Sequence, residues 1–281
     1  MARVKRSPTD QHQELEQLLS FIHQTYGFDF TNYARDSLLR RLNRRASIWQ
    51  LTSLAQLQPL LEREPPRWQE LFSDLSISIT HWFREPRVLN CLVHQVFPFF
   101  DTFPFFKIWI AGCGSGQEVY SLAILLKEYG LLHKAQIYGT DFNEDMLRIA
   151  KAGIYPMASL AERQAAYRMA GGKSDIWRHV SLGYGKVKVA QGIRSRITFA
   201  RHNLVQDGPF AEVELVLCHN VLIYFNRNLK QRAIRLFHQS LYPGGYLGMG
   251  TNESLSYLGF DGEFELSSAE AHLYRKCLDK G

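Results

Sequence analysis

Three alternating glycines followed by a carboxylate form a turn suited to holding a ligand against the backbone. In the stretch AGCGSGQEVYS, Gly112, Gly114 and Gly116 come directly after the apolar run FFKIWI, and Glu118 follows them. A dinucleotide site places a pyrophosphate on the helix N-terminus after such a turn. Glu118 would repel a phosphate there, so a ligand carrying a cationic group is expected. A glycine turn that serves only strand–helix packing is the alternative.

A second carboxylate narrows the ligand class. Asp141 ends the segment AQIYGTD, where an acidic side chain can accept hydrogen bonds from both ribose hydroxyls. Glu118 can attract the ammonium group of an amino acid. A nucleoside joined to an amino acid and lacking phosphate fits this pair. S-adenosylmethionine (AdoMet) is such a molecule, with S-adenosylhomocysteine (AdoHcy) as the product after methyl transfer.

The elements that must position these carboxylates alternate between strands and helices from Phe105 onward. The predicted strands are FKIWIA, AQIYGTD, RITFARHNL, VELVLCHN, GYLGMG and AHLYRKC. Helices are predicted in EVYSLAILLKEYG, NEDMLRIAKAG and NRNLKQRAIRLFHQSL. This order predicts an α/β fold with a doubly wound, mostly parallel sheet, whose ligand site lies at the carboxyl ends of the strands.

The first part of the chain has helical periodicity instead. Its apolar stripes comprise Leu15, Leu18, Leu19 and Ile22, then Leu38, Leu39, Leu42 and Ile48. We therefore expect an N-terminal helical domain and linker over residues 1–78 and a second domain over 79–281. The second helix carries four arginines opposite its stripe: Arg40, Arg41, Arg44 and Arg45. They either form a solvated face or bind an acidic surface.

Positive charge is concentrated in one later segment. The net charge is +6, and residues 161–201 hold nine Lys or Arg against two acids, so this segment accounts for +7. Within it, VSLGYGKVKVAQG predicts a hairpin around Gly183 to Gly185 that displays Lys186 and Lys188. An acidic partner should meet this segment. A solvated face is again the alternative.

Composition excludes several classes of protein. The chain has no run of 18 apolar residues and no apolar stretch after its charged N-terminus, so we expect neither a membrane span nor a signal peptide. The four cysteines are far apart and lack ligand spacing, so neither a metal site nor a disulfide framework is expected. A cytoplasmic location is predicted.

Five segments occur in the order and spacing of the CheR-type chemotaxis receptor methyltransferases, and nearly the whole chain resembles that family. They are ITHWFREP, AGCGSGQEVYSLA, GTDFNEDMLRIAKAGIYP, CHNVLIYFN and LYPGGYLGMGTNESL. The resemblance implies a methyltransferase sheet with an N-terminal helical domain and a small β-subdomain inserted at about 157–196. It implies methyl transfer from AdoMet to glutamate side chains in the cytoplasmic helical region of chemoreceptors, forming γ-glutamyl methyl esters. Some members also bind a receptor C-terminal tail at the insert. A monomeric cytoplasmic protein, recruited to membrane-bound receptor arrays, is expected.

The resemblance also implies roles for individual residues. Thr80, Arg84 and Glu118 would hold the methionine end of AdoMet, with Gly112 in the glycine turn, Asp141 at the ribose, Asn203 and Leu204 at the adenine, and Asn220 closing the pocket. Arg84 and Tyr224 would be catalytic, because they can orient the acceptor carboxylate or the sulfonium. Ser78 and His219 also map to cofactor positions but depart from the family, which usually has asparagine and arginine there. An unperturbed histidine at 219 would be neutral above about pH 6.5.

Two functions of other classes remain open. A weakly active scaffold that binds AdoMet or a nucleotide could regulate a signalling array, although the presence of Arg84 and Tyr224 disfavours this reading. A nucleic-acid methyltransferase would bind phosphates through the basic segment and would need a pocket for a flipped base. No nucleic-acid partner is expected, because the N/D-P-P-Y-type motif that such enzymes often carry is absent from the sequence.

Overall fold

The computed structural model describes residues 8–76 and 80–278, and the chain divides into two compact units. One unit comprises Met1–Ile77 together with Tyr224–Leu229, and the other comprises Ser78–Ile223 together with Lys230–Gly281. Ser78, a predicted cofactor residue, lies outside the described residues. No sequence feature predicted that a short segment after residue 223 would pack with the first unit.

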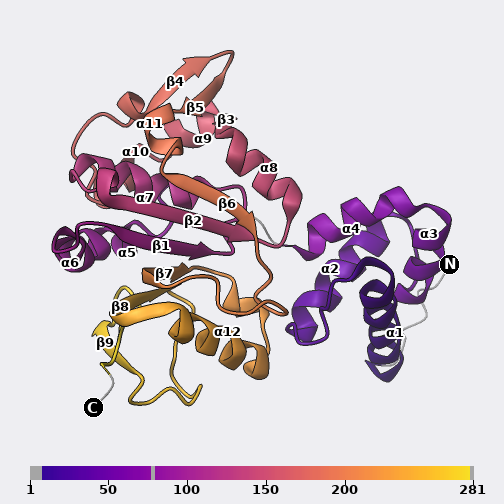
Figure 1. Ribbon diagram of the computed structural model, residues 1–281. Helices are drawn as coiled ribbons and strands as arrows, with labels where there is room; N and C mark the ends of the chain where they lie inside the picture. The colour runs from indigo at the N-terminus through magenta and orange to yellow at the C-terminus, as the bar shows by residue number, and fades with distance from the viewer. Residues whose placement is uncertain (1–7, 77–79, 279–281) are drawn as a thin grey trace. The chain divides into compact units, whose positions relative to one another are not determined.

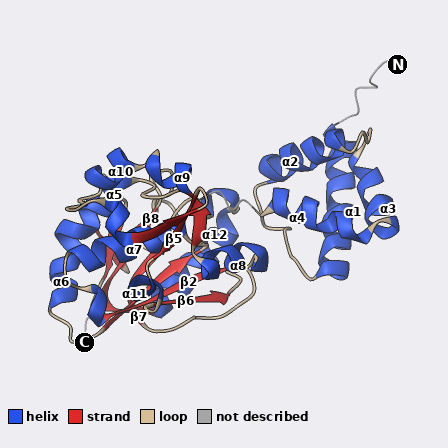
Figure 2. Ribbon diagram, turned by 90° about the horizontal axis from the view of Figure 1, so that it is seen from above, coloured by secondary structure: helices blue, strands red, loops and turns tan. Residues whose placement is uncertain are grey.

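The first unit is built from helices, which Figure 2 shows without strands among the described residues. They are α1 (Pro8–Tyr26), α2 (Arg35–Ile48), α3 (Leu57–Arg63) and α4 (Trp68–Leu75), with 3₁₀ turns at Leu54–Gln56 and Pro65–Arg67. The stripe predicted for the first helix supplies the core, where Leu15 and Leu19 are fully buried. The second stripe is confirmed only in part: Leu38 and Leu42 are buried, whereas Leu39 is half-buried and Ile48, the last residue of α2, is 55% exposed. The Tyr26 ring stacks on Trp68 with centroids 4.1 Å apart.

A seven-stranded sheet organises the second unit (Figure 1). Its strands are β1 (Phe106–Ala111), β2 (Ala135–Asp141), β6 (Ile197–Arg201), β7 (Val213–Cys218), β8 (Leu241–Met249), β9 (Phe264–Ser268) and β10 (Leu273–Lys276). The order is β6-β2-β1-β7-β8-β10-β9. The first five in this order are parallel to one another, while β10 is antiparallel to both β8 and β9. The predicted doubly wound, mostly parallel sheet is thus confirmed.

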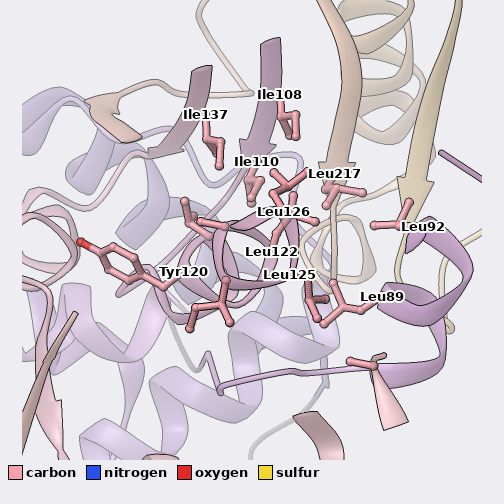
Figure 3. Close-up of a cluster of buried hydrophobic side chains, with 14 of the residues drawn as sticks. Leu89, Leu92, Ile108, Ile110, Tyr120, Leu122, Leu125, Leu126, Ile137 and Leu217 are labelled. Carbon is pink, nitrogen blue, oxygen red and sulfur yellow. The ribbon is translucent and has the colours of Figure 1, made fainter. Parts of the chain in front are cut away.

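Helices cover both faces of this sheet. The helices that follow the linker are α5 (Pro86–Cys91), α6 (Phe97–Asp101), α7 (Gln117–Glu128), α8 (Glu144–Ala152), α9 (Met157–Ala161), α10 (Gln164–Met169), α11 (Gln191–Arg194) and α12 (Arg227–Ser240), of which α9 packs on a second, smaller sheet. Figure 3 shows α7 side chains, including Leu122 and Leu126, packed with Ile108 and Ile110 of β1. On the opposite face, Trp109 meets Phe237 of α12 with ring centroids 5.4 Å apart. The nearly continuous apolar sequence of β1 therefore reflects burial on both faces of the sheet.

Two strands differ from the sequence expectation. The strand predicted as GYLGMG begins earlier, because the preceding stretch YPGG is part of β8, where the β7–β8 register shifts between Val213 and Leu215. Such an irregularity lets a strand accommodate Gly244 at φ 79° without ending. The second difference is β9, which was not predicted. It is an outer strand whose middle residues are exposed, so it lacks the apolar alternation of the inner strands.

A small antiparallel sheet interrupts the main fold after α8. It contains β3 (Ile154–Pro156), β4 (Val180–Gly183) and β5 (Lys186–Val189) in the order β3-β5-β4. The predicted hairpin is confirmed. Its two-residue turn has φ 50° at Tyr184 and 69° at Gly185, which matches a turn type that needs positive φ at both central positions.

Candidate AdoMet site

The turn between β1 and α7 requires its glycines for steric reasons. Gly112 and Gly116 have φ of 71° and 86°, a region that disfavours other residues. A Cβ atom at Gly112 would lie 2.4 Å from Cγ2 of Val221, and one at Gly116 would lie 2.8 Å from Cβ of Ala150. The backbone of the turn is thus held close to its neighbours, and its polar groups are available where side chains would otherwise intrude.

Asp141 is fixed at the end of β2 by this turn. Its Oδ2 accepts a hydrogen bond from Gly114 N at 2.8 Å, and its Oδ1 accepts one from Asn143 N, also at 2.8 Å. Burial raises the pKa of Asp141, while the backbone donors at Asn143 and Gly114 act in the opposite direction. An ionised carboxylate has about four acceptor positions, so both oxygens retain capacity for ribose hydroxyls.

Glu118, in the first turn of α7, forms a buried pair with His219, which follows β7. Their side chains are 9% and 1% exposed, and Nδ1 of the imidazole is hydrogen-bonded to Oε1 of the carboxylate. Burial by itself lowers the pKa of His219, but Glu118 above all, then Glu85 and Glu253, raise it to about 9. His219 is therefore perturbed, and its raised pKa favours the protonated ring above pH 6.5.

Asn220 is held in a strained conformation by a residue that sequence reasoning missed. Its φ is 59°, a left-handed value that asparagine tolerates better than most residues. The buried carboxylate of Glu253 accepts hydrogen bonds from the backbone N–H groups of Asn220, Ile223 and Gly250, at 2.9, 3.1 and 2.8 Å. Glu253 lies in GTNES, within the segment LYPGGYLGMGTNESL that resembles the family. That position in a motif was the sequence signal that could have marked Glu253 as a site residue.

Three buried polar atoms in these segments lack a hydrogen-bond partner among the described residues. They are Thr80 Oγ1, His219 Nε2 and Asn220 Oδ1. Unsatisfied buried groups of this kind are uncommon, because each costs about 1 to 3 kcal/mol. They accompany the carboxylates of Glu118 and Asp141, so donors and acceptors suited to an amino acid and a ribose are both present. These residues fit AdoMet.

The other predicted cofactor residues have less specific surroundings. Asn203 is buried, and His202 N, one residue earlier, donates to the carbonyl of Asp141 at 3.1 Å. The Asn203 side chain accepts from Val205 N at 2.9 Å, which forms a local turn. Leu204 is buried, whereas Arg84 is partly exposed.

Tyr224 belongs to the helical unit in the structure. Its carbonyl accepts a hydrogen bond from Ala34 N at 2.7 Å, and the Arg41 guanidinium lies 4.7 Å from the centre of its ring. The chain then continues along the same segment, where Phe225 forms an isolated bridge with Tyr33. These contacts hold the predicted catalytic tyrosine on α2 and on the loop before it. No local sequence pattern signals this pairing.

The four arginines of α2 separate into two kinds. Arg45 is only 13% exposed and binds Asp74 and Glu70, and Arg41 donates to the Leu75 carbonyl at 3.0 Å. Burial lowers the pKa of Arg41, and Tyr224 is the strongest of the groups that oppose this effect. Arg40 and Arg44 are exposed. The expectation that all four lie on one solvent-facing surface was wrong, because a helix places neighbours in sequence on different faces.

The basic hairpin displays the two predicted lysines. Lys186 and Lys188 are exposed on β5, and the intervening Val187 is buried, so the strand alternates as a half-buried strand should. Leu182 and Tyr184 are also exposed near the turn, at 60% and 105%. Leu182 pairs with Val187 and so lies on the face opposite to the two lysines.

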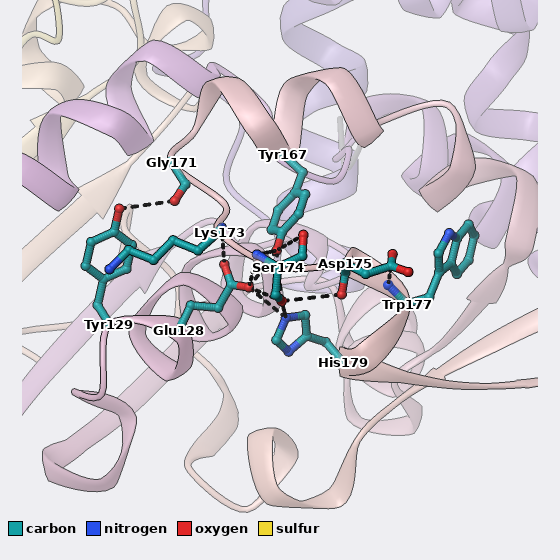
Figure 4. A network of polar contacts seen from close by, with 9 residues as sticks. All are labelled: Glu128, Tyr129, Tyr167, Gly171, Lys173, Ser174, Asp175, Trp177 and His179. Carbon is teal, nitrogen blue, oxygen red and sulfur yellow. Dashed lines mark hydrogen bonds and ion pairs between the residues drawn. The ribbon is translucent and has the colours of Figure 1, made fainter.

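A network of polar groups fixes the inserted segment to the end of α7 (Figure 4). Glu128 accepts hydrogen bonds from the Tyr167 hydroxyl at 2.6 Å, from Lys173 N at 3.0 Å and from Ser174 N at 3.0 Å. Its carboxylate also contacts His179 Nε2 at 3.2 Å. Burial alone would raise the pKa of Glu128, but the donors, led by Ser174 and Tyr167, lower it to about 2. This network is structural.

Metal-binding and membrane-spanning features were also sought in the structure. Over residues 8–76 and 80–278, no group of three or more His, Cys, Asp or Glu side chains could hold a metal ion. Each helix in the same two ranges is too short or too polar to cross a bilayer.

Comparison with known proteins gives the family. A family model described as CheR methyltransferase, SAM binding domain, matches residues 78–272, and one described as CheR methyltransferase, all-alpha domain, matches residues 13–76. A Pseudomonas putida protein designated Cher3 is 38% identical over 263 residues, covering 94% of this chain and 96% of that protein. Chemotaxis protein methyltransferase 1 of Pseudomonas aeruginosa is 30% identical over 250 residues, covering 85% and 89%. The chain belongs to the CheR methyltransferase family, and AdoMet is its cofactor.

Proposed function

We propose that the protein transfers the methyl group of AdoMet to glutamate side chains of chemoreceptors, forming γ-glutamyl methyl esters for sensory adaptation. The observation that carries this proposal is the pair of buried carboxylates, Glu118 and Asp141, at the carboxyl ends of β1 and β2 in a CheR family sheet. The names of relatives such as the Pseudomonas aeruginosa chemotaxis methyltransferase support the choice of acceptor. The protein would act as a cytoplasmic monomer recruited to receptor arrays.

The residues present are sufficient for this reaction without proton transfer. AdoMet supplies a methyl group activated by a sulfonium. A glutamate side chain has an ordinary pKa of about 4.3, so it is already a nucleophile at neutral pH and needs no general base. Arg84 and Tyr224 are proposed to orient this carboxylate, and alignment is a major source of rate enhancement in such transfers. Glu118, His219 and Asp141 would hold the two ends of the cofactor.

Incubation with methyl-labelled AdoMet and receptor cytoplasmic fragments tests the proposal. We expect alkali-labile label on the receptor, because methyl esters hydrolyse in base. Tyr224→Phe should reduce transfer and leave AdoMet affinity unchanged. Asp141→Ala should weaken AdoMet binding by about 1.5 to 3 kcal/mol through the loss of hydrogen bonds to a charged group. AdoMet binding without receptor labelling would favour a regulatory scaffold, and label on nucleic acid would overturn the acceptor.

Receptor docking is proposed to use the exposed arginines of α2. We expect acidic groups beside the acceptor glutamate to bind these arginines, so Arg40→Glu with Arg44→Glu should raise the KM for receptor and weaken its salt dependence. The matched reversal Lys186→Glu with Lys188→Glu should matter only for a receptor with a C-terminal tail, which could pair with the edge of the small sheet. An unchanged KM in the arginine variant at low salt would mean that these residues only solvate the helix.

A further inference from the structure

The Glu118–His219 pair uses one nitrogen of the imidazole ring and leaves the other without a partner. Nδ1 is bonded to Glu118, whereas Nε2 is buried and has no hydrogen-bond partner among the described residues. The His219 side chain is 1% exposed, so bulk water does not satisfy this atom. Nδ1 of His179 is also unpaired, so this state alone does not identify a ligand site. His219 differs because its ring is bonded to Glu118, which follows the glycine turn, so a ligand atom in that site can bind Nε2.

The charge around the ring defines which kind of ligand atom this is. Carboxylates face His219 from three elements: Glu118 on α7, Glu85 in the segment before α5, and Glu253 in the loop after β8. They keep the ring protonated at neutral pH against the effect of burial. Both nitrogens of a protonated imidazole are donors. Nε2 therefore presents an N–H group, whose best partner is an anionic oxygen.

We propose that His219 Nε2–H donates a hydrogen bond to the carboxylate at the methionine end of AdoMet, while Glu118 binds the ammonium group. The pair thereby recognises the amino acid as a zwitterion. Its charges balance, because one carboxylate and one imidazolium meet one ammonium and one carboxylate. A neutral His219 would leave one buried negative charge uncompensated, which is unfavourable. The inference depends on AdoMet as cofactor and not on the methyl acceptor of the proposed function.

Two ligands that differ only at the carboxylate test this role. AdoHcy and its decarboxylated analogue share the nucleoside and the ammonium group, and calorimetry at pH 7.5 gives the affinity of each without any acceptor. We expect His219→Gln to weaken AdoHcy by about tenfold or more, the value for a lost hydrogen bond to a charged group, and the analogue by less than about twofold. His219→Arg, which restores a cation, should recover the preference for AdoHcy.

The same ligands report the protonation of His219. AdoHcy affinity of the wild-type protein should fall as the pH rises past about 9, where the ring loses its proton. The affinity of the analogue should fall less steeply. The ammonium group titrates in both ligands, but the analogue has no carboxylate to lose its bond to His219. His219→Arg should remove the difference between the two profiles, because arginine stays charged.

A second buried histidine provides the control. His179 pairs with Glu128 at the other end of α7, so His179→Gln should leave both affinities unchanged. Equal weakening of the two ligands by His219→Gln, or equal wild-type affinities for them, would overturn the proposal. If His219→Gln does not fold, the pH dependence of the wild-type preference for AdoHcy still decides the question, because an arginine at the methionine end would stay charged over this range. Because no receptor is present, failure here is distinguishable from failure of glutamate methylation.

Discussion

Two buried Glu–His pairs lie at opposite ends of α7, and they have opposite electrostatic properties. Glu118 pairs with His219 at the start of the helix, and Glu128 pairs with His179 at its end. Burial by itself lowers the pKa of both histidines. The carboxylates around His219 outweigh this effect and raise its pKa to about 9, whereas the pKa of His179 stays lowered. The same two residue types therefore give an ion pair in one place and a neutral histidine in the other.

The difference lies in the surrounding groups. Burial dominates at His179, and the cations of Lys127 and Arg178 add to it, so Glu128 alone does not hold a proton on the ring. Glu128 instead takes its stabilisation from hydroxyl and backbone donors. It also ends a helix, where the macrodipole disfavours a negative charge, while Glu118 begins one, where the dipole favours it.

This comparison separates a structural pair from a ligand-binding pair. The donors around Glu128 fill its carboxylate, and they come from the inserted segment that it anchors. The second imidazole nitrogen has no partner among the described residues in either pair, Nδ1 in His179 and Nε2 in His219. The carboxylates differ, because Glu118 is bonded to His219 and its side chain remains 9% exposed. Acceptor capacity left on the carboxylate, more than burial or pairing, distinguishes the AdoMet site.

The largest expected effect is on stability at the structural pair. Glu128→Ala would leave the donors of Ser174, Tyr167 and Lys173 without their acceptor, and we expect the free energy of unfolding to fall by about 3 to 5 kcal/mol. Urea denaturation measures this change. Glu144→Ala, at a position 74% exposed, is the control and should have little effect. A loss below about 1 kcal/mol would mean that water replaces the carboxylate and that the network is not structural.

The second effect should fall on affinity. Glu118→Gln keeps an oxygen for Nδ1 of His219 but removes the charge that attracts an ammonium group. We expect AdoHcy binding to weaken by about 1.5 to 3 kcal/mol, with a smaller loss of stability than for Glu128→Ala. Calorimetry and urea denaturation on the same preparations give both values. Loss of stability without loss of affinity would mean that Glu118, like Glu128, has a structural role and does not bind the cofactor.

The smallest effect is a difference in pH dependence. The pKa of Glu128 is lowered to about 2 from 4.5, so its stabilisation is present above pH 4.5 and is lost as the pH falls through 2. The pKa of His219 is raised to about 9 from 6.5, so its stabilisation is present below pH 6.5 and is lost as the pH rises through 9. Each slope is at most about 1.4 kcal/mol per pH unit.

Unfolding free energies measured across this range, at pH values where the protein refolds, separate the two pairs. Glu128→Gln should reduce the loss of unfolding free energy at acid pH and leave the loss at alkaline pH unchanged. His219→Gln should reduce the loss at alkaline pH and leave the loss at acid pH unchanged. An alkaline limb that persists in His219→Gln would assign the raised pKa to another group.

Much of the fold followed from local patterns. The apolar run FKIWIA became β1, the glycine turn and Glu118 stand where the sequence placed them, and the hairpin turn at Tyr184 and Gly185 has the predicted form. These features depend on neighbours a few residues apart, whose side-chain period and backbone preferences are readable directly. The exposed strand β9 carries no such period and was not predicted.

The sequence by itself determined the fold class, the glycine turn and the two carboxylates that indicate AdoMet, because each depends on residue type and short-range spacing. Only the tertiary structure decided the charge of His219, which depends on a carboxylate 101 residues away. It also decided that Arg41 packs on Tyr224, that Arg45 is held by acids of α4, and that Glu253 holds the loop at Asn220. A pKa and a hydrogen-bond partner are set by distance in space, and residues remote in sequence come within that distance only when the chain folds.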